Sequence, residues 1–322
     1  MGALEYVPAS SEISDINENI NVSEMVKFAS DILNQRETVT LNAQEALTYS
    51  QLVQVGSSAG GARAKALIAW NEKTNEIKSG QLNLDKDYDY WLMKFDNVSK
   101  NGDHGVEDIP EYTLIEYAYY KMAIDAGIQM NECRIYSNNG ENHFMTKRFD
   151  RVNGKKIHMQ SLGAVAHISY KEPGLCSYEM AAGYMRDVKM PMTDIEQFYS
   201  RMVFNCLAVN QDDHVKNISF LMDRNGEWRL SPAYDITFSY DTTNKWLSAH
   251  QMTINGKKRE ISLSDIVEVG KKMGIKKKKC MDIISKISIV TSNFEKYADA
   301  ANIREKTYVE IRKVLDQNKV EI

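Results

Sequence analysis

One stretch in the second half of the chain constrains the fold more than any other, because a long helical pattern ends in an acidic loop that leads into a β-hairpin pattern. Over residues 193–210, apolar residues recur at helical spacing, and Thr193 and Glu196 have the spacing of a capping box. The loop QDDHVKN follows, then the apolar run ISFLM, an Asn-Gly turn signal at 225–226 and the strand-like WRLS. The pattern predicts a helix that delivers an acidic loop to a hairpin, which in turn delivers a second acid, Asp235.

The first half of the chain has the pattern of a mixed lobe of strands and helices. In chain order we predict a helix at 21–34, strands at 49–55, 66–70 and 90–95, a helix at 111–127, and a hairpin of strands 133–137 and 143–149 around an Asn-Asn-Gly turn. From residue 262 to the end the pattern is again helical. We therefore predict an α+β fold of two lobes, a mixed β-rich N-lobe over 1–150 and a mainly helical C-lobe over 151–322.

Length and composition limit the class of protein. A chain of 322 residues corresponds to about two domains or lobes. Its 43% hydrophobic and 26% charged residues and its net charge of -4 are those of a globular protein, and argue against a disordered chain or one that mainly coats nucleic acid. The run Lys276–Lys279 is either a local basic patch for nucleic acid or a partner protein, or a solvated helix entry.

The cysteines and the apolar stretches indicate the compartment. The four cysteines lie far apart, which argues against a disulfide framework and against a zinc site. The sequence has no signal-peptide pattern, and no stretch approaches the ~18 apolar residues that span a bilayer. We therefore expect a cytoplasmic protein that does not enter the membrane.

Several polar motifs follow one another in the order that phosphoryl transfer requires: a backbone cradle for phosphates, a cation, metal ligands and an acid that accepts the hydroxyl proton. Lys94, on a predicted strand, would contact the α/β-phosphates, and Glu116, on the next helix, is its candidate ion-pair partner. Taken singly, these could be a solvated lysine and an ordinary helical glutamate. A glycine-rich loop precedes them and can cover phosphates, because glycine lets backbone N–H groups approach closely, although it could also be only a tight connection. Its residues are Gly56, Ser57, Ser58, Ala59, Gly60 and Gly61.

The acidic loop has the spacing of a kinase catalytic loop. Asp212 and Asn217 lie five positions apart, as do the aspartate and asparagine of H-R-D-L-x-x-x-N. Asp235 follows after a hairpin, as the second metal-binding aspartate does in kinases. Asp212, Asp213 and His214 could also form a water-bound loop or a small metal cluster unrelated to ATP. Charged groups are costly to hold near a core without partners, which favours the functional interpretation.

Five motifs together resemble the HipA-like serine/threonine kinase toxins of bacterial toxin–antitoxin systems, over nearly the whole chain. They are GSSAGGARAK at 56–65, WLMKF at 91–95, KRFDR at 147–151, NQDDHVKN at 210–217 and SPAYDI at 231–236. The resemblance implies a two-lobed, protein-kinase-like fold that binds ATP and Mg²⁺ and phosphorylates a protein serine or threonine. By the same resemblance, Asp212 is the catalytic base, Asn217 and Asp235 hold the metal, and Lys94 binds the phosphates.

The resemblance also implies further nucleotide contacts and a regulatory site. The strand that ends in Lys147-Arg148-Phe149 would meet the adenine through its backbone, and His214 is counted with the nucleotide-binding residues of the catalytic loop. Family members can autophosphorylate a serine of the glycine-rich loop, which expels the loop and silences the enzyme. The matching position is Ser58, with Ser57 beside it, and which of the two is regulatory stays open.

Targets and partners follow from the family as well. Its targets include aminoacyl-tRNA synthetases, so we expect a translation-related protein substrate and arrested translation. The opening MGALEYVPAS resembles a segment that lies well inside longer members, so this chain is expected to be a short, HipT-like form without the N-terminal subdomain. Expected partners are a small antitoxin that resembles this subdomain and a helix-turn-helix antitoxin, through which DNA would be contacted only indirectly.

Two other functions remain as alternatives. A small-molecule kinase of the aminoglycoside-phosphotransferase type would usually have H-G before the catalytic aspartate, where this chain has Asn210-Gln211. A catalytically silent partner of a DNA-binding repressor would have no chemical need for the lysine, the base and both metal ligands together.

Overall fold

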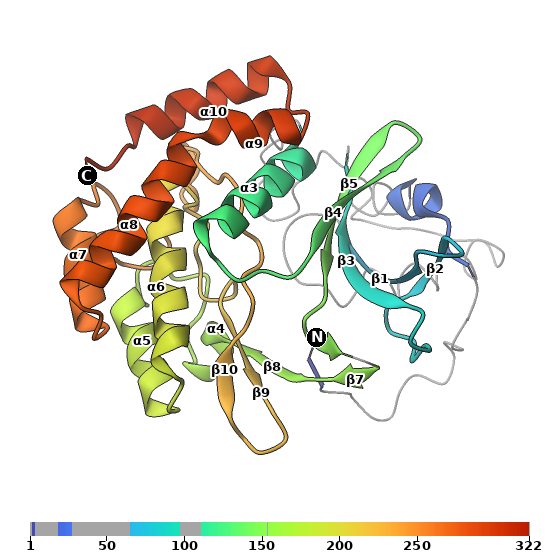
Figure 1. Ribbon diagram of the computed structural model, residues 1–322, viewed down its shortest axis with the longest axis horizontal. Coiled ribbons are helices and arrows are strands. Elements are labelled where there is room, and N and C mark those ends of the chain that lie inside the picture. The colour runs from blue at the N-terminus through green and yellow to red at the C-terminus, as the bar shows by residue number, and fades with distance from the viewer. Residues whose placement is uncertain (1, 4–18, 28–64, 97–110, 153, 322) are drawn as a thin grey trace. The chain divides into compact units, whose positions relative to one another are not determined.

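The computed structural model describes residues 2–3, 19–27, 65–96, 111–152 and 154–321, which belong to two compact units (Figure 1). The first unit comprises Met1–Leu114 and Glu132–Ile157, and the second comprises Ile115–Asn131 and His158–Ile322. The predicted α+β composition is confirmed. The functions assigned above to residues 1–150 and 151–322 remain predictions.

The first unit is built on a five-stranded antiparallel sheet in the order β2-β1-β3-β5-β4. The predicted strands at 66–70 and 90–95 and the predicted hairpin are confirmed, and both turn residues of the hairpin, Asn139 and Gly140, have positive φ, as a type I′ turn requires. Residues 22–27 are helical and place Val22 and Met25 against the sheet core, whereas the rest of the predicted helix, the strand at 49–55 and the glycine-rich loop lie outside the described residues. The strands are β1 Lys65–Asn71, β2 Glu76–Ser79, β3 Asp89–Lys94, β4 Cys133–Asn138 and β5 Glu141–Lys147, and a separate ribbon contains β6 Arg151–Val152 and β7 Lys155–Lys156.

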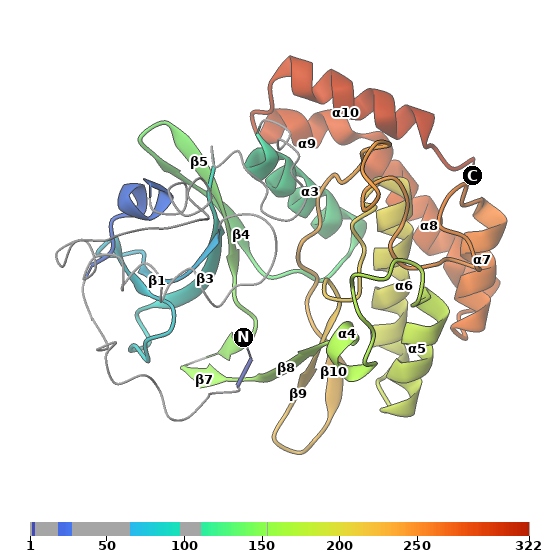
Figure 2. The same ribbon diagram turned by 180° about the vertical axis from the view of Figure 1, so that it is seen from behind.

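The second unit is mainly helical, with α6 packed against both α5 and α8 (Figures 1 and 2). The apolar face of α6 is buried, as its periodicity predicts, and polar residues such as Arg201 and Asn205 are buried as well. A three-stranded sheet in the order β10-β9-β8 completes the unit. The helices are α3 Tyr112–Ala126, α4 Leu162–Val165, α5 Tyr178–Asp187, α6 Met192–Leu207, α7 Leu263–Lys272, α8 Lys277–Ser292, α9 Phe294–Ala300 and α10 Glu305–Gln317, and the strands are β8 His158–Ser161, β9 Ser219–Met222 and β10 Trp228–Leu230.

The start of α6 differs from the prediction. The capping box of Thr193 and Glu196 is wrong, because the helix begins one residue earlier, with Pro191 as the N-cap and no side-chain capping bond. A tertiary contact stabilises this end instead: the Asp194 carboxylate accepts bonds from the Arg229 guanidinium at 2.8 Å and from the backbone N–H of Leu230 at 2.9 Å. This end of α6 is therefore stabilised by hydrogen bonds from β10 and not by a capping bond within its own first turn.

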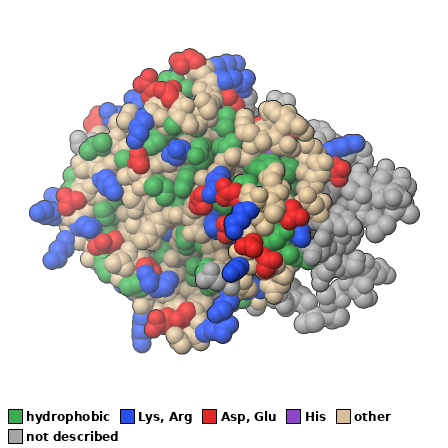
Figure 3. Space-filling model, turned by 45° about the vertical axis from the view of Figure 1, so that its right-hand side comes forward, with side chains coloured by type: hydrophobic (Ala, Val, Ile, Leu, Met, Phe, Trp, Pro, Cys, Tyr) green, Lys and Arg blue, Asp and Glu red, His purple; other side chains and the backbone are tan. Residues whose placement is uncertain are grey.

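The lysine run lies at the start of a helix, as one of its two interpretations predicts. Lys276 is the N-cap of α8, and the next three lysines form the first turn. Acidic residues lie among the lysines of this region, with Lys279 3.5 Å from Glu196 and Lys272 3.5 Å from Glu179. Figure 3 likewise shows acidic and basic side chains interspersed over the described part of the face that it presents.

Two further observations concern cysteines and membranes. All four cysteines are free and buried, so the prediction that they form no disulfide framework is confirmed. Within the described part of the chain, no helix combines the length and the apolar character needed to cross a membrane.

Candidate active site

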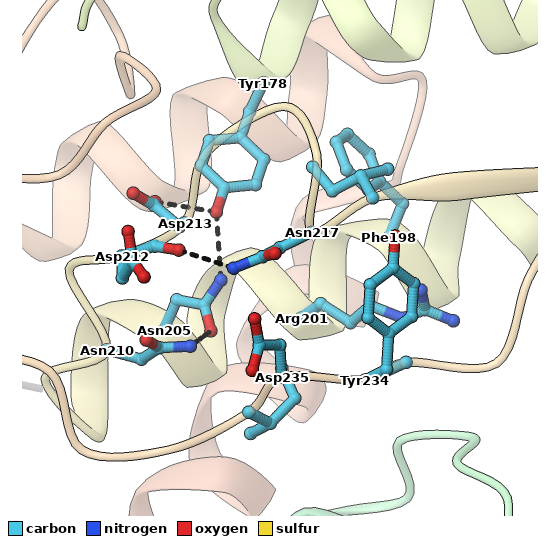
Figure 4. A pocket seen from close by; sticks show the side chains of 13 residues that line it. Tyr178, Phe198, Arg201, Asn205, Asn210, Asp212, Asp213, Asn217, Tyr234 and Asp235 are labelled. Carbon is cyan, nitrogen blue, oxygen red and sulfur yellow. Dashed lines mark hydrogen bonds between the residues drawn. The ribbon is translucent and has the colours of Figure 1, made fainter. Parts of the chain in front are cut away.

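The catalytic and metal-binding residues predicted from the sequence line one pocket of the second unit. Asp212, Asn217 and Asp235 surround it, although they come from a loop and from the segment after a hairpin (Figure 4). The other lining residues are Tyr178, Phe198, Arg201, Asn205, Asn210, Asp213, Ile218, Ala233, Tyr234 and Ile236.

The acidic loop begins where α6 ends, and hydrogen bonds fix its first residues. The Asn210 side-chain amide donates to Asn205 Oδ1 at 3.0 Å, and the Asn210 backbone N–H donates to the Asn205 carbonyl at 2.9 Å. The Gln211 N–H donates to the Ser239 carbonyl at 3.0 Å. Residue 209, a valine, has a φ of 52°, which turns the chain sharply out of the helix. The loop therefore starts in a fixed direction.

The five-residue spacing of Asp212 and Asn217 is explained by a bond that closes the loop. Asn217 Nδ2 donates to the Asp212 backbone carbonyl at 2.9 Å (Figure 4), and the Asn217 N–H donates to the His214 carbonyl at 2.9 Å. Because the amide nitrogen of Asn217 is used in this way, its Oδ1 is the atom that would serve as a metal ligand. The Asp212 side chain is 37% exposed, so a substrate hydroxyl can reach it, and His214 Nε2 lies 3.9 Å from its Oδ1.

Asp213 has the opposite environment, with a side chain only 1% exposed. Its carboxylate accepts hydrogen bonds from the Tyr178 hydroxyl at 2.8 Å, from His250 Nδ1 at 2.9 Å and from the Gln251 N–H at 2.6 Å. Burial by itself would lower the pKa of His250, but the Asp213 carboxylate raises that pKa well above its usual value. The Asp213 carboxylate therefore favours the protonated form of His250, and Tyr178, His250 and Gln251 together hold the loop at Asp213.

Asp235 has a backbone conformation that a non-glycine residue rarely adopts, with a φ of 58°. Such strain persists only where neighbouring structure imposes it, and it clusters at functional sites. The preceding segment is held firmly: Ser231 N–H donates to the Ser219 carbonyl at 2.9 Å, and Ala233 N–H donates to the Gln129 carbonyl at 2.7 Å. The buried Arg201 guanidinium donates to the Ser231 carbonyl as well.

The pocket offers the donor set of a magnesium site that is completed by a substrate. Among the described residues, no group of three or more His, Cys, Asp and Glu side chains could hold a metal alone. Mg²⁺ is commonly bound through one or two carboxylates together with phosphate oxygens and waters, so a pocket with Asp235, the Asn217 amide and the nearby Asp212 fits a metal that arrives with a nucleotide.

The remaining predicted residues are not in this pocket. Lys94, which is 5% exposed, and Lys147 lie on β3 and β5 of the first unit, and Phe149 follows β5. Glu116 is buried on α3 in the second unit, so its ion pair with Lys94 remains a prediction. The Lys147 ammonium lies 2.7 Å from Asp89 and its backbone N–H donates to the Glu132 carbonyl at 2.8 Å, so the contact of this strand with adenine remains a prediction. Gly56–Gly61, with Ser57 and Ser58, lie outside the described residues.

Several pocket residues were missed by the sequence analysis. Arg201 and Asn205 are polar residues four positions apart in α6, and this spacing places them on one side of the helix. That signal was available in the sequence. Tyr178 and Tyr234 gave no such signal, because isolated tyrosines at the start of a helix or after a hairpin are common in cores.

Comparison with known proteins gives one family and several relatives. The model of the HipA-like C-terminal domain matches residues 57–294. A putative kinase of Haemophilus influenzae is 28% identical over 159 residues, which are 44% of this chain and 46% of that protein, so the chain spans about half the length of this curated relative.

Two solved structures are similar. A chain from the Shewanella oneidensis MR-1 complex of HipA, HipB and operator DNA superposes with a TM-score of 0.66 at 16% identity, covering 98% of this chain and 74% of that one. The Helicobacter pylori proinflammatory kinase CtkA has a TM-score of 0.49 at 14% identity, covering 73% of this chain and 88% of that one. The first similarity shows a shared fold.

Proposed function

Because this chain belongs to the family of HipA-like C-terminal domains, we propose that it is a protein kinase that uses ATP and Mg²⁺ to phosphorylate a serine or threonine of another protein. The observation that carries the proposal is that Asp212, Asn217 and Asp235 line one pocket. The family and the similarity to a protein described as a putative kinase support phosphoryl transfer in general. Serine or threonine as the acceptor comes from the motif resemblance alone.

In this proposal the pocket residues have different roles. The exposed carboxylate of Asp212 accepts the proton of the attacking hydroxyl, while Asn217 Oδ1 and the Asp235 carboxylate hold the metal. Bound Mg²⁺ would neutralise charge on the phosphates. His214 would contact the nucleotide from the same loop. The further nucleotide contacts in this proposal are Gly56–Gly61, Lys94 with Glu116 as its partner, and the backbone at Lys147 and Phe149.

The biological role in the proposal is that of a toxin of a bacterial toxin–antitoxin system. The similarity in fold to a chain from a complex of HipA, HipB and operator DNA is consistent with a helix-turn-helix antitoxin as partner, with DNA contacted through it. The proposal also includes a small antitoxin that resembles the N-terminal subdomain, a translation-related substrate and a cytoplasmic location. It further includes autophosphorylation at Ser58 or Ser57.

The test is incubation with labelled ATP and Mg²⁺, followed by mapping of phosphorylated sites, for the parent, Asp212→Asn and Asp282→Asn. Asp282 is an exposed aspartate of α8 and serves as the matched control. We expect Asp212→Asn to lose roughly 100-fold or more of the transfer rate, as when a general base is removed, and Asp282→Asn to match the parent. Equal labelling of the parent and Asp212→Asn would contradict the assignment of the base. Transfer to an aminoglycoside but to no protein would favour a small-molecule kinase.

A further inference from the structure

One hydroxyl group connects the two segments that carry the proposed metal ligands. Tyr234 directly precedes Asp235, and Lys216 directly precedes Asn217. The Tyr234 hydroxyl lies 2.6 Å from the Lys216 carbonyl oxygen and 2.5 Å from Ser219 Oγ. Since a carbonyl oxygen only accepts, the Tyr234 O–H donates to Lys216, and the Ser219 hydroxyl donates to Tyr234. The residues just before the two ligands are therefore joined by a side chain.

This connection is separate from the bonds that hold the catalytic base. The residue after Asp212, Asp213, is fixed by the Tyr178 hydroxyl, by His250 Nδ1 and by the Gln251 N–H. Figure 4 shows the two tyrosines at opposite sides of the pocket, with the Tyr178 hydroxyl directed at Asp213 and Tyr234 next to Asp235. The Asp213 carboxylate and the Lys216 carbonyl are thus bound by different tyrosines, so a pair of tyrosine variants can compare the two contacts.

We propose that Tyr234 is a positioning residue that sets the separation of Asn217 and Asp235 and thereby the affinity for a metal–nucleotide complex. The inference rests on the proposed function, because it assumes that these two residues hold the metal. The strained φ of 58° at Asp235 gives the inference its physical basis. A residue in that conformation needs neighbours that hold it there, and Tyr234 is the adjacent residue with a side-chain bond to the opposite ligand segment.

The experiment compares the parent with Tyr234→Phe and Tyr178→Phe, each of which removes a single hydroxyl. Binding of Mn²⁺ with a non-hydrolysable ATP analogue is followed by the electron paramagnetic resonance of free Mn²⁺, and kcat is measured over a Mg²⁺ titration. Loss of a group that orients metal ligands typically weakens metal binding by roughly 10- to 100-fold. We expect this for Tyr234→Phe, with most of kcat restored at saturating Mg²⁺. For Tyr178→Phe we expect unchanged Mn²⁺ binding and a lowered kcat.

A second variant covers the case in which Tyr234→Phe fails to fold. Ser219→Ala removes only the hydroxyl that donates to Tyr234, and we expect it to weaken Mn²⁺ binding by a smaller factor. If a folded Tyr234→Phe protein binds the Mn²⁺–nucleotide complex as tightly as the parent, the inference is wrong while the proposed function stands. The same holds if Tyr234→Phe is unfolded and Ser219→Ala binds like the parent. A parent that binds no metal–nucleotide complex would overturn the proposed function itself, and the inference with it.

Discussion

At the scale of single residues, two neighbouring carboxylates of one loop have opposite environments. The Asp212 side chain is 37% exposed, whereas that of Asp213 is 1% exposed and accepts three hydrogen bonds. Taking a charge out of water is costly unless it is paired and hydrogen-bonded, and the buried imidazolium of His250 provides the pair. The Asp212 carboxylate is thus accessible to solvent, and the Asp213 carboxylate holds the loop in place.

This arrangement predicts a pH dependence of stability. The pKa of His250 is raised in the folded protein, so the ion pair contributes fully below the unfolded pKa of about 6.5 and loses its contribution as the pH rises through the folded pKa. The measurement is the unfolding free energy from urea denaturation, between about pH 6 and pH 9.5, for the parent and the double variant Asp213→Asn with His250→Gln. The amount by which the unfolding free energy of the parent exceeds that of the double variant should decrease as the pH rises. A difference that does not change with pH would contradict the prediction.

At the scale of elements, the sequence predicted what local patterns determine. The period of α6, the hairpin of β9 and β10, and the turn at Asn139-Gly140 follow from spacing and from residues that adopt positive φ. The strand β8 was missed, because the four-residue segment His158–Ser161 becomes a strand only by pairing with β9. Pairing partners distant in sequence leave no local signal.

The candidate site, too, was predicted from the sequence only where local spacing determines it. The spacing of Asp212, Asn217 and Asp235 was visible in the sequence, and the structure places all three at one pocket. The supports of the site were not visible, because Tyr178, His250 and Arg201 act through contacts across 27 to 37 positions of the chain. For the same reason the N-terminus of α6 was mispredicted, since its stabilising partner, Arg229, lies 35 positions away.

That end of α6 yields a prediction at this scale. Asp194→Ala should destabilise the protein by about 1.5 to 3 kcal/mol, because it leaves the Arg229 guanidinium and the Leu230 N–H without their acceptor. Thr193→Ala should change the unfolding free energy by less than about 0.5 kcal/mol, since Thr193 makes no capping bond. Chemical denaturation of both variants measures the two losses of unfolding free energy. A larger loss for Thr193→Ala than for Asp194→Ala would support the capping box instead.

At the scale of the whole molecule, both units are discontinuous in sequence. Residues 115–131 interrupt the first unit and pack with the second, where Tyr119 is buried and its hydroxyl donates to the Ala208 carbonyl at 2.7 Å. The same ring lies edge-on to Phe204 and Phe294, with centroids 6.2 and 5.9 Å away. The helical unit therefore needs α3 as part of its core.

A fragment experiment tests this dependence. Residues 158–322 expressed alone lack α3 and should not show the cooperative thermal unfolding of the intact chain. Adding a peptide of residues 111–131 should restore part of it, and a Tyr119→Ala peptide should restore less, because it lacks the ring between Phe204 and Phe294. Cooperative unfolding of residues 158–322 without the peptide would show that α3 is dispensable.

The place of α3 also has a consequence during synthesis. Phe294 is made 175 positions after Tyr119, and at about 5 to 20 residues per second a ribosome needs about 10 to 35 s to cover that distance. During this time the face of α3 that carries Tyr119 lacks its contact with Phe294. A nascent chain of this design would be without its complete helical unit until translation is nearly finished, and a chaperone or a partner has that interval in which to bind it first.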